Sequence, residues 1–477
     1  MDVQPDVRLS DMLAIGFGTT VAMWAIAYVG HMPLVQLPPS LFVGLMLFAL
    51  VVGGWLAGRT TRRGLRGGIW VGLISAALNL LILGSLLREP GSGQLVPQAW
   101  LWVPGWFAVS VLLAAIGALA GKTGRPTRRG TVPFSPTMLG AWCPENRDSP
   151  RSQVNWLAAF AWITCLAALL LITAGGLVTG FRAGMAVPDW PNTFGSNMFL
   201  YPLSRMTGGV FYEHAHRLLG TLVGMATLVL AVQITAQGDS PIFVERKLGQ
   251  SPACPFVGRK GLVRLVWLVG AGVVVQGVLG GFRVTDDSHC LAVVHGCFAH
   301  AVLGGLVAIA VLLCRGPTAD SAEHWQSQWH PVAADRFLTA LLAAVVLLQT
   351  LLGTLVRQLN LTLLSHAALA AIVVLCTLGA GMRAWGLRSG APVLRRFGVA
   401  LMLLVVLQVS LGIVAVAFRT PPVGDSPSAE ALAAAAGRLP IATVPALITT
   451  AHQATAAVIL GVAMALAAWT WRLAKPA

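Results

Sequence analysis

The strongest constraint on this chain is a set of twelve apolar runs, each close to the length that crosses a lipid bilayer. The runs cover residues 11–30, 41–58, 68–88, 99–121, 155–180, 211–234, 263–283, 291–314, 336–357, 362–383, 396–418 and 444–471. A backbone inside lipid must satisfy its own hydrogen bonds, so runs of this length form helices. The sequence predicts an all-α polytopic membrane protein with about 12 transmembrane helices.

Charge and composition agree with a membrane protein and argue against a nucleic-acid partner. The chain of 477 residues is 56% hydrophobic and only 10% charged, and its net charge of +15 comes largely from basic residues between the apolar runs. These basic segments are residues 59–66, 121–130, 246–260 and 383–396. Because basic loops stay on the cytoplasmic side, we expect both termini to be cytoplasmic and the membrane to be a bacterial inner membrane. The seven cysteines form no CxxC pair, so a zinc site is not indicated.

Changes in composition divide the chain into five predicted segments. Residues 1–121 hold four apolar runs and form an accessory transmembrane module of unknown role. Residues 122–153 are rich in Pro, Gly and Arg, which predicts a cytoplasmic linker. The other eight runs form two four-helix bundles, at 154–315 and 336–477, joined by a cytoplasmic linker at 316–335. Between the runs at 155–180 and 211–234 lies a segment long enough to be a folded lid.

An internal repeat relates the last eight runs. In each pair of runs, the first ends in a Gly-containing turn: ITAGGLVTG, GVLGGFRVT, TLLGTLVRQ or VSLGIVAVA. The second carries a histidine near its outer end, and these four are His216, His295, His366 and His452. A hairpin that recurs four times indicates duplication of a four-helix unit. It predicts two pseudo-symmetric bundles, each with two histidines near the outer leaflet.

Two neutral imidazoles that face each other inside an apolar bundle are the arrangement that an axially ligated haem needs. We therefore expect His216 to pair with His295, and His366 with His452, as iron ligands of two porphyrin sites. Zinc would require more ligands at each site. His300 follows His295 by five residues, about 140° round a helix, and so faces elsewhere. Whether His300 contributes to the first site stays open.

Only the first pair has charged residues beside it. Glu213, His216 and Arg217 are spaced i, i+3 and i+4 and share one helix face, whereas His214 lies on another. Ionisable groups in a transmembrane helix mark functional sites, so we expect Glu213 to take or deliver protons there. Arg217 would pair with a porphyrin propionate or keep Glu213 ionised. The structural alternative is an acid favoured by a helix N-terminus and an arginine that snorkels.

The sequence resembles the haem A synthase family over roughly residues 155–471. The resemblance is carried by the E-x-x-H-R motif at Glu213, His216 and Arg217, by AVVHGCFAHA around His295, by TTAHQATAAVILG around His452 and by GMAVPDWPNTFG in the long outer segment. Two features depart from the family. The long outer segment lacks the paired cysteines that some members carry, and Ala367 follows His366 where many relatives have Arg.

The resemblance implies an enzyme of cytochrome oxidase biogenesis. The family oxidises the methyl group at porphyrin position 8 of haem O to the formyl group of haem A. By analogy, His216 and His295 bind the substrate haem O, and Glu213 and Arg217 are catalytic. The second pair, His366 and His452, would bind a haem b cofactor. A haem O synthase and an electron-transfer protein are candidate partners, and the lipid bilayer surrounds the helices.

Two other functions stay open on the sequence alone. A dihaem b-type electron-transfer cytochrome would use the same four histidines without chemistry on a porphyrin, and a polytopic transporter would also contain repeats. Glu213 beside one pair favours the enzyme, and polar groups near the outer helix ends, not at mid-membrane, disfavour the transporter. The sequence does not indicate the electron donor or acceptor, the source of the formyl oxygen or the oligomeric state.

Overall fold

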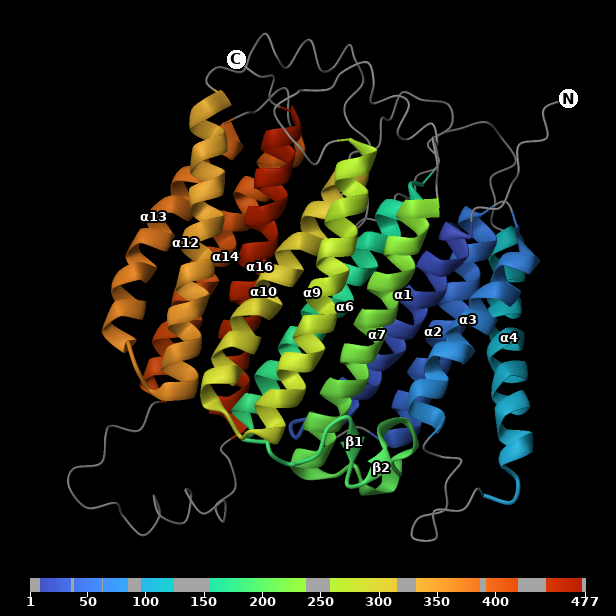
Figure 1. Cartoon of the computed structure of the whole chain (residues 1–477). Coiled ribbons are helices and arrows are strands. Elements are labelled where there is room, and N and C mark those ends of the chain that lie inside the picture. The colour runs from blue at the N-terminus through green and yellow to red at the C-terminus, as the bar shows by residue number, and fades with distance from the viewer. Residues whose placement is uncertain are drawn as a thin grey trace, which may run out of the picture.

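The computed structural model describes residues 9–35, 38–61, 63–84, 96–123, 154–236, 258–314, 332–386, 392–418 and 443–473. Within these ranges, twelve helices are long and apolar enough to cross a membrane. The helices stand side by side, and the chain passes from the blue helices at one end of the assembly to the orange and red ones at the other (Figure 1). The prediction of an all-α polytopic fold is confirmed.

Each helix matches one predicted apolar run. The first four are α1 (Ser10–Gly30), α2 (Pro39–Thr60), α3 (Leu65–Leu83) and α4 (Ala99–Thr123). The other eight are α6 (Trp156–Gly180), α7 (Gly208–Ala236), α9 (Arg259–Thr285), α10 (His289–Leu313), α12 (Val332–Leu359), α13 (Leu363–Gly386), α14 (Pro392–Ala417) and α16 (Thr443–Leu473). Between α6 and α7, two short strands, β1 (Asn192–Thr193) and β2 (Ser196–Asn197), pair antiparallel beside the 3-10 turns η2 (Met198–Leu200) and η3 (Leu203–Arg205).

The start of α12 differs from the prediction. This helix begins at Val332, inside the segment that the sequence assigned to a cytoplasmic linker at 316–335. Asp335 lies in its first turn, where the helix dipole favours an acid, and pairs with Arg383 of α13. The other predicted linker, 122–153, lies outside the described residues except for Lys122 and Thr123, which end α4. The basic residues at 246–257 also lie outside them.

The last eight helices pack as two rings of four. In the first ring α6, α7, α9 and α10 each contact the next, and α10 closes onto α6; α12, α13, α14 and α16 repeat this arrangement. Consequently α7 lies diagonally across from α10, and α13 across from α16. The two bundles meet along α6, α10, α12 and α16. This is the pair of pseudo-symmetric bundles that the sequence predicts.

The first four helices form a third group, joined to the first bundle chiefly by α1. Within the group, glycines let α2 and α4 approach closely: a Cβ at Gly54 would collide with the carbonyl oxygen of Ala114. Against the bundle, Phe17 of α1 meets Phe160 of α6 edge to face, with ring centres 5.2 Å apart. Nearby, Gly18 lies against Ile163.

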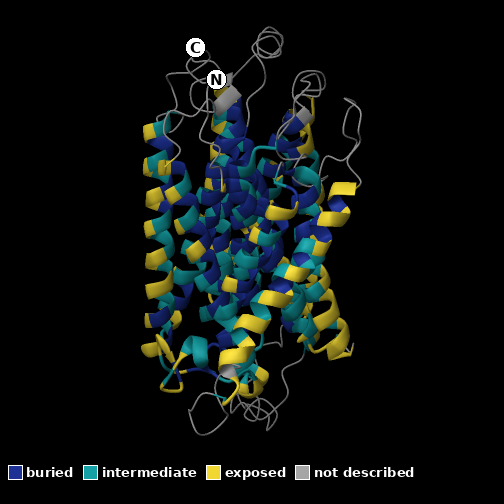
Figure 2. Cartoon of the chain, turned by 90° about the vertical axis from the view of Figure 1, so that its right-hand side faces the viewer, coloured by how far each residue is buried: buried dark blue, intermediate teal, exposed yellow. Residues whose placement is uncertain are grey.

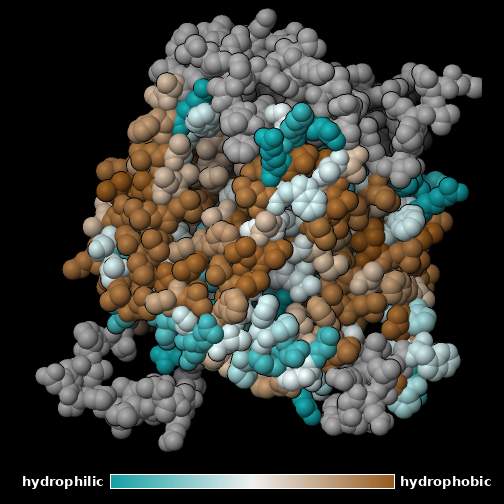
Figure 3. Space-filling view, in the orientation of Figure 1, coloured by the Kyte–Doolittle hydropathy of each residue, from teal (hydrophilic) through white to brown (hydrophobic). Residues whose placement is uncertain are grey.

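The surface of the helical body is apolar. A broad hydrophobic belt crosses the visible face, and hydrophilic residues gather above and below it (Figure 3). Buried residues fill the interior of the assembly, and exposed ones lie on its outer faces (Figure 2). The exposed side chains of α9 and α14 include Leu268, Val274, Leu403 and Ile413. Apolar faces of this extent suit lipid, and the chain is an integral membrane protein.

Candidate functional site

The four histidines of the repeat meet in two pairs. His216 on α7 faces His295 on α10, with ring centres 6.4 Å apart and ring planes at 71°. His366 on α13 faces His452 on α16, with centres 6.3 Å apart and planes at 76°. In each pair the helices lie diagonally across the bundle, so the rings meet in its interior. The structure therefore brings together the histidines that the repeat pairs; their binding of a metal stays a prediction.

The separation within each pair suits one metal ion between two imidazoles. With metal–nitrogen bonds of about 2.0 Å, two imidazoles on opposite sides of one metal have ring centres roughly 6.2 Å apart. Two aromatic rings in edge-to-face contact have a similar spacing. The distance alone therefore does not distinguish a metal-binding pair from aromatic packing, and the surroundings of the rings have to do so. Among the residues that the structure describes, no three His, Cys, Asp or Glu side chains gather as a metal cluster.

Each histidine ring lies against a glycine of the preceding helix. The contacts are His216 on Gly175, His295 on Gly280, His366 on Gly353 and His452 on Gly412. A Cβ at Gly175 or Gly280 would lie 2.9 Å from the ring Cε1, so that the ring would have to shift, and at Gly353 and Gly412 the distances of 3.1 and 3.0 Å are tighter than most real Cβ contacts. The Gly-containing turns of the repeat therefore seat all four imidazoles in the same pose, which plain aromatic packing does not require.

Three glutamines that the sequence analysis missed support three of these histidines. Gln276, Gln349 and Gln408 each precede the seating glycine by four residues. Nε2 of Gln276 donates to the backbone carbonyl of His295 at 2.9 Å and lies 3.1 Å from its Nδ1. Nε2 of Gln349 donates to the carbonyl of His366 at 2.9 Å, and Nε2 of Gln408 lies 3.3 Å from Nε2 of His452. In the sequence, these glutamines are visible as a Q-x-x-x-G pattern that occurs in three of the four repeats.

Glu213 lies one helical turn before His216 and is buried, with 4% of its surface exposed. Nε of Arg217 donates to Oε1 of Glu213 at 3.2 Å. The other donors of Arg217 reach the segment between α6 and α7: they bond to the carbonyl oxygens of Asp189 (2.7 Å), Asn192 (3.0 Å) and Val187 (2.8 Å). Arg217 thus joins the buried carboxylate to this segment. Arg217 was expected to pair with a porphyrin propionate or with Glu213, and the structure shows the pair with Glu213.

The segment 181–207 folds against the same end of the first bundle, where β1 and β2 appear in Figure 1. Asp189 organises its turn by accepting the N–H groups of Phe194 and Gly195, each at 2.8 Å. Burial acts to raise the pKa of Asp189, but these bonds outweigh it and hold that pKa below its ordinary value. The segment is therefore a folded structure, as its length suggested.

Two side chains fasten this segment to α9. The ring of Trp190 rests on Gly281, where a Cβ would collide with the ring. From α9, Nη1 of Arg283 donates to the carbonyl of Gly184 at 2.6 Å. The positive charge of Arg283 also acts on Glu213 and on both rings of the first pair. The sequence analysis did not single out Arg283.

The two neighbouring histidines do not join the pairs. His214 is buried and turned to the segment 181–207, where its Nδ1 lies 3.1 Å from Oγ1 of Thr193 and its ring centre 5.3 Å from that of Tyr201. His300 is buried in α10, and its Nδ1 bonds to the carbonyl of Gly296 at 2.8 Å. His214 thus supports the covering segment, in agreement with its predicted helix face.

A polar link connects the two pairs across the bundle interface. The guanidinium of Arg357, near the end of α12, donates to the carbonyl of Gly176 at 2.6 Å and to Oε1 of Gln453. Gly176 adjoins the glycine that seats His216, and Gln453 follows His452. A second contact joins Cys297 of α10 to Thr354 of α12, with Sγ and Oγ1 3.1 Å apart. Such contacts could not be read from sequence because they join residues of different helices.

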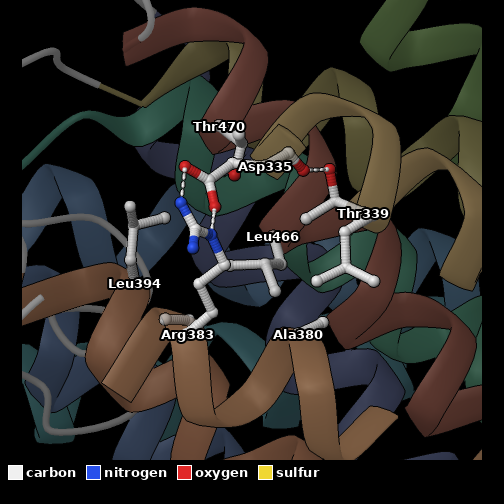
Figure 4. Close-up of a pocket in the computed structure, with 9 residues that line it drawn as sticks. Asp335, Thr339, Ala380, Arg383, Leu394, Leu466 and Thr470 are labelled. Atoms are coloured by element: carbon white, nitrogen blue, oxygen red, sulfur yellow. Dashed lines mark hydrogen bonds and ion pairs between the residues drawn. The ribbon is translucent and has the colours of Figure 1, made fainter. Parts of the chain in front are cut away.

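A small cavity lies away from both pairs, among α12, α13, α14 and α16 (Figure 4). Its volume is about 20 Å³, room for little more than one water. The carboxylate of Asp335 pairs with Arg383 on its wall, and the Thr339 hydroxyl donates to the Asp335 carbonyl at 2.8 Å. This ion pair fastens α12 to α13, and the cavity is too small for an organic substrate.

Part of the chain matches the model of a known protein family. Residues 158–365 match the family model described as cytochrome oxidase assembly protein, COX15-CtaA. The match runs from α6 to the first turn of α13, so it includes Glu213, His216 and His295 and stops one residue before His366. No curated protein and no solved structure matches the chain. The family match confirms the predicted resemblance over these residues and supports a role in cytochrome oxidase assembly.

Proposed function

We propose that the chain oxidises the methyl group at porphyrin position 8 of haem O to the formyl group of haem A. The observation that supports this most is that, among the residues that the structure describes, a buried carboxylate, Glu213, lies beside the first of two otherwise similar histidine pairs and none lies beside the second. A chain that only carried electrons would have no need of a buried proton acceptor at one pair. The family match at the first bundle points to the same biological process.

The residues around both pairs fit an iron porphyrin. The ring centres of the two pairs lie 6.4 and 6.3 Å apart, a separation that suits one metal ion, and each ring is half-buried and rests on a glycine. His216 and His295 would bind the substrate haem O, and His366 and His452 a resident haem b. When bound, haem b supplies one-electron transfer.

With water as the source of the formyl oxygen, conversion of the methyl group releases four electrons and four protons, and Glu213 would accept the protons. Its ion pair with Arg217 favours the ionised carboxylate, the form that can accept a proton. Arg217 also holds the segment 181–207 over this end of the bundle. Arg217 is in this way a positioning residue as well as the partner of Glu213.

The link between the pairs suits the passage of electrons from the substrate site to the second site. Arg357 reaches both bundles through Gly176 and Gln453, and its positive charge is close to His452. An electron-transfer protein would then reoxidise the second site, and a haem O synthase would supply the substrate. The same link would also serve a dihaem electron-transfer cytochrome, which is the second candidate function.

Expression beside a haem O source, followed by mass analysis of the extracted porphyrins, tests the proposal. We expect formyl porphyrin from the unaltered chain and at least a hundredfold less from Glu213→Gln, since positioned proton transfer contributes about 10²–10⁴-fold. The matched control is Asp335→Asn, which removes another buried, arginine-paired carboxylate at the cavity of Figure 4. It should leave the product per protein unchanged.

The bis-histidine absorption spectrum of each variant shows whether its porphyrin sites are intact. Equal amounts of formyl porphyrin from Glu213→Gln and the unaltered chain would remove Glu213 from the reaction. No formyl porphyrin from an unaltered chain that binds two porphyrins would leave the electron-transfer cytochrome as the better reading.

A further inference from the structure

Two of the helices that seat a histidine also carry an arginine on the seating face. On α9, Arg283 follows the seating glycine by three residues, and on α12, Arg357 follows it by four. Residues at these spacings share one helix face, so each arginine lies one turn beyond the glycine, near the end of its helix. The other two seating helices, α6 and α14, have no arginine at either spacing. Each bundle therefore has one arginine at this position.

The helices that carry these arginines face the rim of the expected porphyrins. In each ring of four helices, the paired histidines lie on a diagonal, α7 and α10 or α13 and α16. Two axial ligands bind on opposite faces of a porphyrin, so its rim would face the other two helices of the ring, which include α9 and α12. The charged groups on the rim of haem O or haem b are two propionate carboxylates. An arginine on α9 or α12 is therefore placed to meet a carboxylate.

Both guanidinium groups have unused donors. Among the described residues, the Arg283 side chain makes one hydrogen bond, to the carbonyl of Gly184, and the Arg357 side chain makes two, to Gly176 and Gln453. None of the ion pairs between described residues includes either arginine. A guanidinium has five N–H donors, and a charge in a transmembrane helix is costly without a counter-charge. A bound carboxylate would supply both the acceptors and the negative charge.

Arg217, in contrast, is already engaged. Its side chain makes four hydrogen bonds, one to Glu213 and three to carbonyl oxygens of the segment 181–207. A propionate at the first pair therefore needs another cation. Arg283 is close enough for its charge to act on Glu213 and on both rings of that pair, and the charge of Arg357 acts in the same way on His452.

We propose that Arg283 binds a propionate of the substrate haem O and that Arg357 binds a propionate of the haem b cofactor. The methyl group at porphyrin position 8 shares its pyrrole ring with one of the two propionates. A propionate held by Arg283 would therefore keep this methyl group at the end of the bundle where Glu213 lies. Arg283 is in this way a substrate-binding residue that positions the reacting group. The inference rests on the proposed function, because it requires a porphyrin at each pair.

Titration of the purified full chain, freed of its own porphyrin, with two porphyrins tests this inference. One is iron protoporphyrin, and the other is its dimethyl ester, in which both carboxylates are blocked. Arg283→Gln should bind iron protoporphyrin about tenfold or more weakly at one site, the size of a lost charge-assisted hydrogen bond, and should bind the ester like the unaltered chain. Adding Arg357→Gln should weaken the other site in the same way. The control Arg264→Gln removes an exposed arginine near the other end of α9 and should change neither affinity.

Two results would overturn the inference: unchanged affinity of Arg283→Gln for iron protoporphyrin, or an equal loss of affinity for both porphyrins, which would mean that Arg283 only supports the fold. If Arg283→Gln does not fold, Arg283→Lys is measured instead, and an equal loss for both porphyrins again decides against the inference. Formyl porphyrin is measured separately. Carboxylate-dependent binding without formyl product from the unaltered chain would count against the proposed reaction alone. Formyl product without any effect of the arginines on binding would count against this inference alone.

Discussion

At the scale of single residues, the segment 181–207 depends on a few charged groups. Asp189 closes its turn through two backbone N–H groups, and Arg217 ties the carbonyl of the same residue to α7. Because Arg217 also pairs with Glu213, the fold of the segment and the state of the carboxylate depend on one guanidinium. Structure and proposed chemistry are therefore coupled through Arg217.

The lowered pKa of Asp189 predicts an acid-sensitive segment. The free energy contributed by an ionised Asp189 is complete above the usual aspartate pKa of about 3.9 and is lost as the pH falls through the lower folded-state pKa. Pepsin cleavage at Phe194 should therefore begin only at low pH in the unaltered chain. Above that pH, cleavage of Asp189→Ala should be roughly tenfold faster or more, because charge-assisted hydrogen bonds contribute about 1.5–3 kcal/mol, and the two profiles should converge at lower pH. Identical cleavage profiles would contradict this role.

At the scale of elements, each hairpin of the repeat positions one imidazole, which lies against a glycine of the first helix of the hairpin. The first helix of a hairpin supplies the glycine and, in three of the four hairpins, a glutamine side chain. The facing histidine ring comes from the other hairpin of the same bundle. The unit is therefore complete only when two hairpins pack together, which explains why the chain contains the hairpin four times.

Two glycines three residues apart on α9 test this view. In Gly280→Ala the new Cβ would lie 2.9 Å from Cε1 of His295 and displace the ring, so we expect roughly tenfold less porphyrin at the first pair, the size of an outer-contact loss. Gly277→Ala adds the same methyl group where nothing lies within 4 Å, so its porphyrin content should not change. Equal porphyrin content, measured by the pyridine haemochrome, would show that the glycine contact does not position His295.

At the scale of the whole molecule, the first four helices brace the first bundle. α1 packs along α6, and near its end His31 stacks on Phe211 of α7, with ring centres 4.6 Å apart. Tyr28 contacts the rings of Phe211 and Tyr212, immediately before Glu213. Gly84, after α3, approaches the backbone of Phe199 in the covering segment. The accessory module thus touches both the helix and the segment that surround Glu213.

If this packing holds the module in place, the covalent connection is dispensable. Two chains, residues 1–130 and 131–477, should copurify when expressed together. Gly18→Leu should prevent copurification, because a Cβ at Gly18 already lies 3.2 Å from Cδ1 of Ile163 on α6. Gly44→Leu, where nothing lies within 4 Å, is the matched control and should copurify. Loss of association in both variants, or in neither, would count against the α1–α6 contact.

The sequence by itself determined the twelve helices and the four histidines, because crossing lipid demands a long apolar helix and a repeat shows its period directly. The i, i+3, i+4 spacing also placed Glu213 and Arg217 together, since that contact lies within one helix. Only the tertiary structure decided which side chains support each ring. The roles of Gln276, Arg283 and Arg357 depend on distances between different helices, and helix period carries no information about the neighbour against which a helix packs.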